Sequence, residues 1–214
     1  MSFDDCYFLI PAREGSKGFP HKNRKLFKFT AEIIPDEYKD RVFVSTDDAH
    51  IMEQAREAGI GVVVRPDHLS IDTTSMKDVL KHFIEQKSIT NKSNVVLLYL
   101  TYPERTWSDV ERIYSRFVEL DEKSLVCFER VKEHPYLCFY EQPNNKASMI
   151  VDHKLYRRQD YPSCIRLSMY VSCYSVPIVN RLHDLMFEDN TYFYELGSKK
   201  IDVDYIEDYN EAKK

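Results

Sequence analysis

A stretch rich in glycine and basic residues near the amino terminus has the composition of an anion-binding loop. It reads I-P-A-R-E-G-S-K-G-F-P-H-K-N from Ile10 to Asn23. Gly15 and Gly18 permit backbone conformations that bring N–H groups close to an oxyanion. Arg13, Lys17 and Lys22 add positive charge around the same point. The spacing matches neither the P-loop, G-x-x-x-x-G-K-[ST], nor the dinucleotide-binding pattern, G-x-G-x-x-G. It therefore predicts a different kind of triphosphate site. The alternative, a solvated basic turn, is less favoured because the glycines, the cations and the position after a strand coincide.

Two carboxylates near the other end of the chain, Asp202 and Asp204, could hold a metal ion. They stand two residues apart in a segment that reads as a strand, and such residues point to the same face. Paired carboxylates suit Mg²⁺, which also bridges to substrate phosphates. Alone, this pair is more typical of a solvated strand end. Together with the basic stretch, it predicts a magnesium site.

The elements that must position these residues alternate along the first 130 residues. Short apolar runs that read as strands are Tyr7 to Pro11, Arg41 to Thr46, Gly61 to Arg65, Asn94 to Leu100 and Leu125 to Glu129. Helical patterns cover Asp48 to Ala58, Thr74 to Gln86 and Ser108 to Leu120, with Ser108 as the expected N-cap. This alternation predicts an α/β fold with a mostly parallel sheet. The basic stretch follows the first strand directly, at the sheet edge where such folds bind ligands.

The pattern loosens after residue 130 into shorter apolar runs separated by turn signals. We expect an arm at about residues 132–166 that projects from the sheet and pairs with a second copy of the chain, because exposed short strands seek a partner edge. No repeat or linker divides the sequence, so residues 1–214 are predicted to form a single domain.

Composition and charge limit the class of protein. Of the 214 residues, 43% are hydrophobic and 30% charged, as in a globular chain that buries a sizeable core. The net charge is −5, yet six basic residues and one glutamate give residues 12–28 a charge of +5, so the remainder carries −10. A nucleic-acid binder would spread its cations over an extended face. The pattern favours a small anionic ligand over nucleic acid.

The sequence also carries expectations about the cellular setting. Its apolar runs fall far short of the roughly 20 residues that span a bilayer. The first residues include Asp4 and Asp5, where a secretory signal would be positive. The five cysteines show no C-x-x-C spacing. We therefore expect a cytoplasmic protein without a membrane span or a zinc site, with reduced thiols.

The pattern I-P-A-R-x-G-S-K-G-x-x-x-K-N resembles the amino-terminal signature of the CMP-acylneuraminate (CMP-sialic acid) synthetases, which are related to the CMP-Kdo synthetases. The likeness continues through V-S-T-D-D at Val44, R-P-D-H-L at Arg65 with D-T-T-S at Asp72, P-E-R-T at Pro103, R-Q-D-Y-P at Arg158 and I-D-V-D at Ile201. These blocks span almost the whole chain in the family's order. The resemblance implies the Rossmann-like three-layer sandwich of the nucleotidyltransferases.

The resemblance also implies roles for particular residues. Nucleotide contacts fall on Ala12, Arg13, Ser16, Lys17, Lys22, Asn23 and Ser75, and catalytic roles on Arg13, Lys17, Lys22 and Asp204. The D-x-D pair, Asp202 and Asp204, would bind the catalytic Mg²⁺. Acceptor contacts fall on Tyr99, Tyr102, Arg105, Gln159 and Arg166. Ser75 also fits the first turn of a helix, where its hydroxyl would satisfy backbone N–H groups. His134 is a candidate general base, although a histidine in a surface turn is the more common reading.

Two departures from the family pattern concern the acceptor side. The family pattern L-Q-P-T-S-P-L-R is replaced by L-Y-L-T-Y-P-E-R, which puts Tyr99 in place of glutamine and Tyr102 in place of serine. After R-Q-D-Y-P, only Arg166 aligns cleanly with the usual R-x-N-G-A-x-Y. Larger rings change both the volume and the hydrogen-bonding pattern of a pocket. The catalytic class is therefore better supported than the acceptor.

The resemblance as a whole implies a magnesium-dependent cytidylyltransferase, and the expected arm predicts that it is a homodimer. It would use CTP to form the CMP derivative of an acidic sugar, a nonulosonic acid of the sialic type, for surface-glycan assembly, with release of pyrophosphate. The departures leave open another anionic acceptor, such as Kdo, a phosphonate or a phosphorylated small molecule. They also leave open a nucleotide-binding protein without catalysis.

Overall fold

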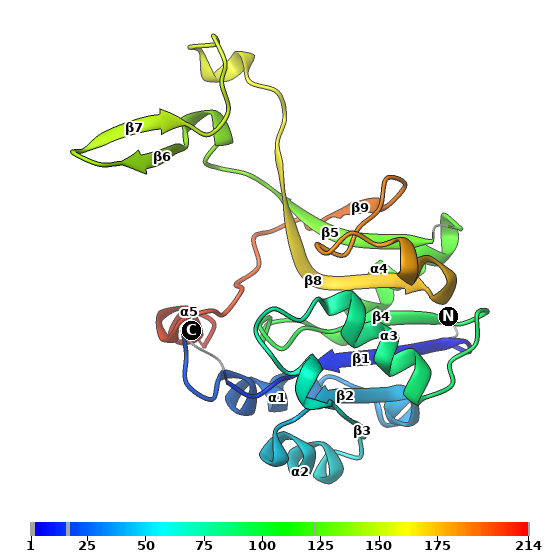
Figure 1. Cartoon of the computed structure of the whole chain (residues 1–214). Coiled ribbons are helices and arrows are strands. Elements are labelled where there is room, and N and C mark those ends of the chain that lie inside the picture. The colour runs from blue at the N-terminus through cyan, green and yellow to red at the C-terminus, as the bar shows by residue number, and fades with distance from the viewer. Residues whose placement is uncertain (1–2, 16–17, 122, 214) are drawn as a thin grey trace.

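The computed structural model describes residues 3–15, 18–121 and 123–213, and across these residues a seven-stranded sheet forms the centre of the molecule (Figure 1). Its strands are β1 Cys6–Pro11, β2 Val42–Thr46, β3 Gly61–Val64, β4 Asn94–Leu97, β5 Ser124–Arg130, β8 Ile165–Ser175 and β9 Tyr192–Glu195. Their order in the sheet is β3-β2-β1-β4-β8-β5-β9. Strand β8 runs antiparallel to both of its neighbours, and the other described pairings are parallel. The mostly parallel sheet is confirmed.

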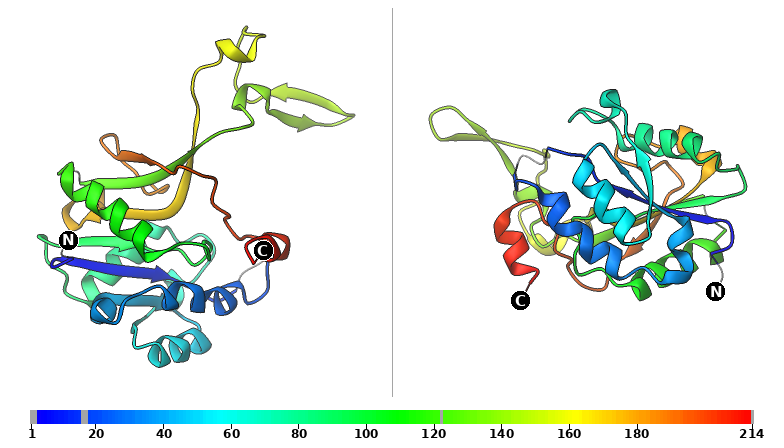
Figure 2. Two further views of the ribbon diagram at one scale, coloured as in Figure 1. Left: turned by 180° about the vertical axis from the view of Figure 1, so that it is seen from behind. Right: turned by 90° about the horizontal axis from the view of Figure 1, so that it is seen from below.

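Helices cover both faces of this sheet (Figure 2). The helices are α1 Lys22–Glu32, α2 Ala49–Glu57, α3 Met76–Gln86, α4 Trp107–Glu119 and α5 Ile206–Glu211. Helices α1, α2 and α4 share one core cluster, whereas α3 and the 3₁₀ turn Val176–Arg181 share the other. Strand β1 feeds both clusters, since Phe8 and Ile10 point to one face and Leu9 to the other. The three-layer arrangement follows from this two-sided burial.

Several element boundaries differ from those expected. Helix α4 begins at Trp107, with Thr106 as its N-cap in place of Ser108. The hydroxyl of Thr106 accepts a hydrogen bond from the backbone N–H of Asp109, whose carboxylate reaches back to Thr106. The sequence predicted a strand at Asp202 and Asp204, but residues 201–204 are not in a strand. They form an extended segment in which the buried Val203 donates to the carbonyl of Thr101 at 2.8 Å.

The expected arm is a hairpin that projects away from the sheet (Figures 1 and 2). It contains β6 Phe139–Gln142 and β7 Lys146–Met149, which pair with each other in a separate antiparallel sheet. A short 3₁₀ turn, Pro135–Leu137, precedes β6, and another, Arg158–Asp160, lies on the segment that leads from β7 back to β8. Apolar side chains along the arm are exposed, among them those of Phe139, Tyr140, Ile150, Leu155 and Tyr156.

Among the described residues, every helix is too short or too polar to cross a lipid bilayer.

Candidate active site

The loops that leave β1, β3 and β4 open together into a cavity of about 370 Å³. It lies at the carboxyl ends of these parallel strands, where open α/β sheets bind their ligands. Its lining includes Arg13, Lys22, Asn23, Arg65, Tyr99 and Asp204. The cavity therefore combines residues from the basic stretch, from the middle of the chain and from the carboxyl-terminal segment.

The basic stretch and the D-x-D segment meet directly. The Nζ of Lys22 donates to Asp204 Oδ1 at 2.8 Å and to the carbonyl of Val203 at 2.9 Å. Gly18 lies against the same segment, because a Cβ at this position would stand 2.9 Å from the carbonyl oxygen of Asp204. Such a distance is too short for any side chain other than hydrogen. The ion pair therefore brings together residues that are 182 positions apart in the sequence.

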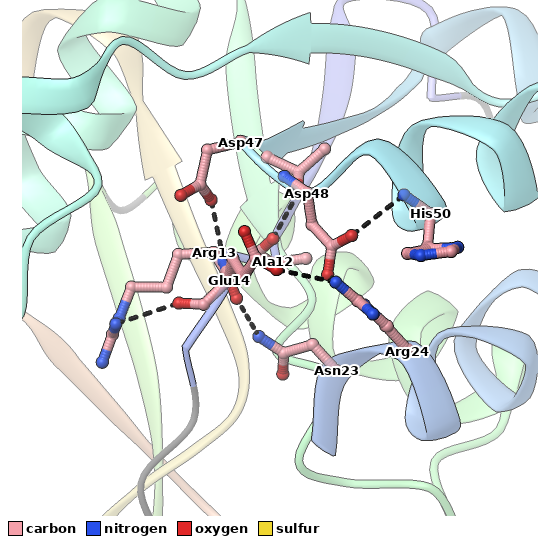
Figure 3. Close-up of polar contacts among 9 residues, drawn as sticks. Ala12, Arg13, Glu14, Asn23, Arg24, Asp47, Asp48 and His50 are labelled. Atoms are coloured by element: carbon pink, nitrogen blue, oxygen red, sulfur yellow. Dashed lines mark hydrogen bonds and ion pairs between the residues drawn. The ribbon is translucent and has the colours of Figure 1, made fainter. Parts of the chain in front are cut away.

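Hydrogen bonds fix the backbone of the basic stretch where it leaves β1 (Figure 3). Asn23 Nδ2 donates to the carbonyl of Arg13 at 2.9 Å. Thr46 Oγ1 donates to the carbonyl of Ala12 at 2.5 Å, and the N–H of Ala12 donates to Ser45. Both backbone polar groups of Ala12 are therefore engaged with the end of β2. Ala12 and Asn23, predicted as nucleotide contacts, shape the stretch in this structure.

A second layer of charged residues supports the same stretch (Figure 3). The N–H of Glu14 donates to Asp47 Oδ1 at 2.7 Å. Arg24 bridges two acids, donating to Asp48 at 2.6 Å and to Glu14 at 2.7 Å. Asp48 is 2% exposed, and the Arg24 guanidinium helps to hold the pKa of its carboxyl below the usual range against the opposing effect of burial. Sequence reasoning missed this support, although adjacent acids after the second strand were a visible signal.

Two arginines bring positive charge to the cavity. Arg13 Nη2 forms an ion pair with Asp72 Oδ1 at 2.5 Å, which ties the basic stretch to the loop after β3. Arg65 is 4% exposed and donates to the hydroxyl and the carbonyl of Ser45. Burial, together with the positive charge of Arg13, lowers the pKa of Arg65 to about 10, so this side chain stays charged at neutral pH. Arg65 was not among the predicted site residues, and its place directly after the third strand was the available signal.

Ser75 is the N-cap of α3. Its hydroxyl accepts from the N–H of Asp78 at 3.1 Å and donates to the Asp78 carboxylate at 2.7 Å. Its neighbours Thr74 and Met76 line the cavity, whereas Ser75 is absent from that lining. The capping interpretation of this serine therefore describes its observed contacts. Ser16 and Lys17, predicted as nucleotide contacts, lie outside the described residues.

The predicted acceptor residues lie in different parts of the structure and do not form one site. Tyr99 lines the cavity. Tyr102 is 3% exposed, and its hydroxyl donates to Asp202 at 3.0 Å. Burial and the neighbouring Asp202 raise the Tyr102 pKa well above its usual value. Gln159 is exposed in the arm, and Arg166, at the start of β8, pairs with Glu129 at 2.9 Å.

His134, the candidate base, also lies at the arm and away from the cavity lining. Its Nδ1 accepts from the N–H of Tyr136, and its Nε2 lies 2.9 Å from the carbonyl of Pro162. Both ring nitrogens therefore have local partners, as in an ordinary turn histidine.

Arg105 has a structural position in place of the predicted acceptor contact. It is 2% exposed and donates to the carbonyl of Tyr170 at 2.8 Å and to Thr30 Oγ1 at 3.1 Å. Burial lowers its pKa to about 10, which still leaves the guanidinium charged. Because the side chain is enclosed by the core, we now assign Arg105 to the support of α1, the β4–α4 loop and β8.

Replacing Arg105 with alanine is expected to destabilise the fold. The change leaves the Tyr170 carbonyl and the Thr30 hydroxyl without their buried donor, which costs on the order of 3 kcal/mol. Thermal unfolding followed by circular dichroism should show a melting temperature lower by roughly 6–12 °C. Arg56→Ala, which removes an exposed arginine of α2, is the control and should melt like the wild type. An unchanged melting temperature for Arg105→Ala would contradict the structural role.

The D-x-D carboxylates form a donor set that fits Mg²⁺. Both side chains are exposed, and Asp204 lines the cavity. Among the described residues, no group of three or more His, Cys, Asp or Glu side chains forms a complete protein metal site. Mg²⁺ is commonly held by one or two carboxylates, with substrate phosphates and water filling the remaining positions. Asp204, which lines the cationic cavity, would supply one such carboxylate, and Asp202, two positions away, would supply a second.

The fold and the site define an α/β nucleotidyltransferase-like protein. A family model described as cytidylyltransferase matches residues 7–176, and the chain belongs to this family. It is 31% identical over 216 residues to an N-acylneuraminate cytidylyltransferase of Streptococcus agalactiae serotype V, covering 94% of this chain and 51% of that protein. The chain thus spans about half the length of this relative. It is 30% identical over 159 residues to a pseudaminic acid cytidylyltransferase of Campylobacter jejuni, covering 70% of this chain and 68% of that protein.

Solved structures share the fold. The structure of a CMP:2-keto-3-deoxy-manno-octonic acid synthetase complexed with CTP matches with a TM-score of 0.69 and 14% identity, covering 98% of this chain and 97% of that one. A 4-diphosphocytidyl-2C-methyl-D-erythritol synthase of Anaerococcus prevotii matches with a TM-score of 0.58 and 12% identity, covering 99% and 97%. The expected fold class and the resemblance to the cytidylyltransferases are confirmed.

Proposed function

We propose that this chain carries the cytidylyl-transfer site of an enzyme that joins CMP from CTP to an acidic sugar, a nonulosonic acid of the sialic type, with release of pyrophosphate. The observation that carries the proposal is the contact of Lys22 with Asp204 in a cavity that also holds Arg13 and Arg65. The cationic side chains would bind a polyphosphate, and the adjacent carboxylate would bind a metal ion that the polyphosphate carries. The choice of cytidine and of the sugar class rests on family membership and on the named relatives.

In the proposed reaction, a hydroxyl oxygen of the acceptor attacks the α-phosphorus of CTP in line, the hydroxyl proton passes to solvent, and the bond to the departing pyrophosphate breaks. The protein contributes mainly position and charge. Arg13 and Lys22, with Lys17, would hold the β- and γ-phosphates. Arg13 would exchange its contact with Asp72 for a phosphate contact. Asp202 and Asp204 would hold Mg²⁺, which when bound supplies charge neutralisation at the α-phosphate and lowers the pKa of the acceptor hydroxyl.

The acceptor is identified by testing candidate substrates. Tyr99 is a predicted acceptor residue, and it lines the cavity. Pyrophosphate release from CTP should be measured with sialic, pseudaminic and Kdo-type sugar acids and with phosphonates. Release with a nonulosonic acid supports the proposal, and release with another acceptor changes the substrate. CTP binding without release for any acceptor would instead support a nucleotide-binding protein without catalysis.

The arm supports the proposal of a homodimer. Its exposed apolar side chains, including Phe139, Tyr140 and Tyr156, need a partner surface in water. A second copy is the partner that we propose. Sedimentation velocity should give twice the mass of the chain. A monomer at micromolar concentration would contradict this assembly.

We also propose a cytoplasmic location. The cysteines of the described residues are free thiols, which is typical of a reducing compartment. Cell fractionation that recovers the protein outside the cytoplasm would contradict the proposal.

A further inference from the structure

The hydroxyl of Tyr102 has three hydrogen-bonding partners in a nearly closed environment. It donates to Asp202 Oδ2 at 3.0 Å. It accepts from the N–H of Met169 at 3.2 Å and from the hydroxyl of Ser168 at 3.4 Å. A hydroxyl has one proton and two acceptor lone pairs. Because both acceptor positions face donors, the proton is directed at the Asp202 carboxylate.

An irregularity in β8 makes this arrangement possible. Strand β5 pairs Val126 with Ser172 and Cys127 with Ser168, so residues 169–171 lie between the paired positions of β8. A bulge of this kind leaves backbone groups outside the ladder and redirects nearby side chains. The N–H of Met169 is one such group, and it bonds to Tyr102. The ring of Tyr102 packs edge-on against Tyr170, with centroids 5.5 Å apart.

The other end of the contact is also held in place. Val203 is fully buried, and its N–H donates to the carbonyl of Thr101 at 2.8 Å. The backbone beside Asp202 is thereby fixed against the segment that carries Tyr102. A carboxylate held at its backbone and at Oδ2 has few orientations left, and its Oδ1 accepts no hydrogen bond from the part of the chain that the structure describes.

We infer that Tyr102 is a positioning residue, whose hydroxyl orients the Asp202 carboxylate for a divalent cation. The sequence pattern had placed this tyrosine among the acceptor contacts, whereas its observed partners belong to the metal side of the site. Hydrogen bonds to metal-binding carboxylates fix their direction, and losing one commonly weakens metal affinity about 10- to 100-fold. This inference rests on the proposed function, because that proposal makes Asp202 a magnesium ligand.

The test is metal affinity measured independently of turnover. Mn²⁺ binding to the full chain in the presence of CTP should be titrated by electron paramagnetic resonance. Tyr102→Phe removes the hydroxyl and keeps the ring, and its Kd for Mn²⁺ should rise at least about tenfold. In an Asp202→Asn background, the same substitution should change the Kd by less than about twofold, because the residue acts through that carboxylate.

The matched control is Tyr174→Phe, which removes another buried hydroxyl, one that donates to the carbonyl of Met186 at 2.8 Å. It should lower stability to a similar extent and leave the Mn²⁺ affinity unchanged. Titrations are made at 10 °C, after circular dichroism shows that each variant is folded.

A Kd of Tyr102→Phe within about twofold of the wild-type value would overturn the inference. So would an equal loss in the Asp202→Asn background, since the effect would then not pass through Asp202. The proposed function is judged separately, by pyrophosphate release from the wild-type chain. If Tyr102→Phe does not fold, Tyr102→His is tested instead, because its ring retains a hydrogen-bond donor. A Kd for Mn²⁺ more than tenfold above the wild-type value in this folded variant would also contradict the inference.

Discussion

Replacing Asp204 with alanine is expected to lower kcat for CMP transfer more than about 10³-fold. The reason is that the substitution removes two contributions together. Loss of one preorganised charge contact in such a site costs roughly 10²- to 10³-fold in turnover. Asp204 is also the partner of Lys22, so its loss releases that cation from its observed position beside the cavity. The measurement is steady-state release of pyrophosphate from CTP at saturating Mg²⁺ and acceptor.

The matched control is Glu207→Gln, which removes an exposed carboxylate from α5, three positions along the chain. It should keep kcat within about twofold of the wild-type value. Melting temperatures of both variants show whether the fold is intact, and we expect little change because the Asp204 side chain is 64% exposed. Near-normal turnover in Asp204→Ala would exclude the carboxylate from the reaction.

Replacing Lys22 with methionine is expected to lower kcat/KM for CTP by about 10²- to 10³-fold. Methionine has a similar length and keeps the apolar part of the contact, but it removes the charge that we propose to hold the phosphates. Negative charge increases on the departing pyrophosphate during the reaction, so part of the loss should appear in kcat and part in KM. Initial rates over a range of CTP concentrations separate these two parameters.

Lys28→Met is the control for this variant. Lys28 is exposed further along α1 and lies over the ring of Phe29, 5.1 Å from its centroid. Lys28→Met changes the net charge by the same amount as Lys22→Met, and its kcat/KM should stay near the wild-type value. Lys22→Met and Asp204→Ala should also be less than additive in combination, because the two residues form one ion pair. An unchanged kcat/KM for Lys22→Met would remove Lys22 from the nucleotide site.

The success and failure of the sequence predictions have separate physical causes. Side chains of β1 alternate between the two buried faces of the sheet, with Leu9 on one face and Ile10 on the other, because of local strand geometry, and the helical spacing of α4 is likewise local. These features were predictable to within a few residues. Prediction of side-chain roles failed where the same local sequence is compatible with either a buried or an exposed side chain. Nothing near Arg105 in the sequence shows that its guanidinium is enclosed by Thr30 and Tyr170.

The carboxyl-terminal segment shows the same limit. The alternation of Asp202, Val203 and Asp204 was visible, and the burial of Val203 between two exposed acids agrees with it. Its assignment to a strand was wrong, because the segment bonds to the carbonyl of Thr101 without joining the sheet. Alternation requires an extended backbone, but a ladder requires a neighbouring strand edge that the sequence does not reveal.

The sequence by itself determined the α/β class, the position of the basic stretch after the first strand and the family, because these depend on periodicity and motif order. Tertiary structure alone decided that Lys22 reaches Asp204, that Arg65 lines the cavity and that Tyr102 faces Asp202. Those contacts join segments far apart in the chain. Their geometry depends on how the sheet, its bulge in β8 and the covering helices pack together, which no local pattern of residues records.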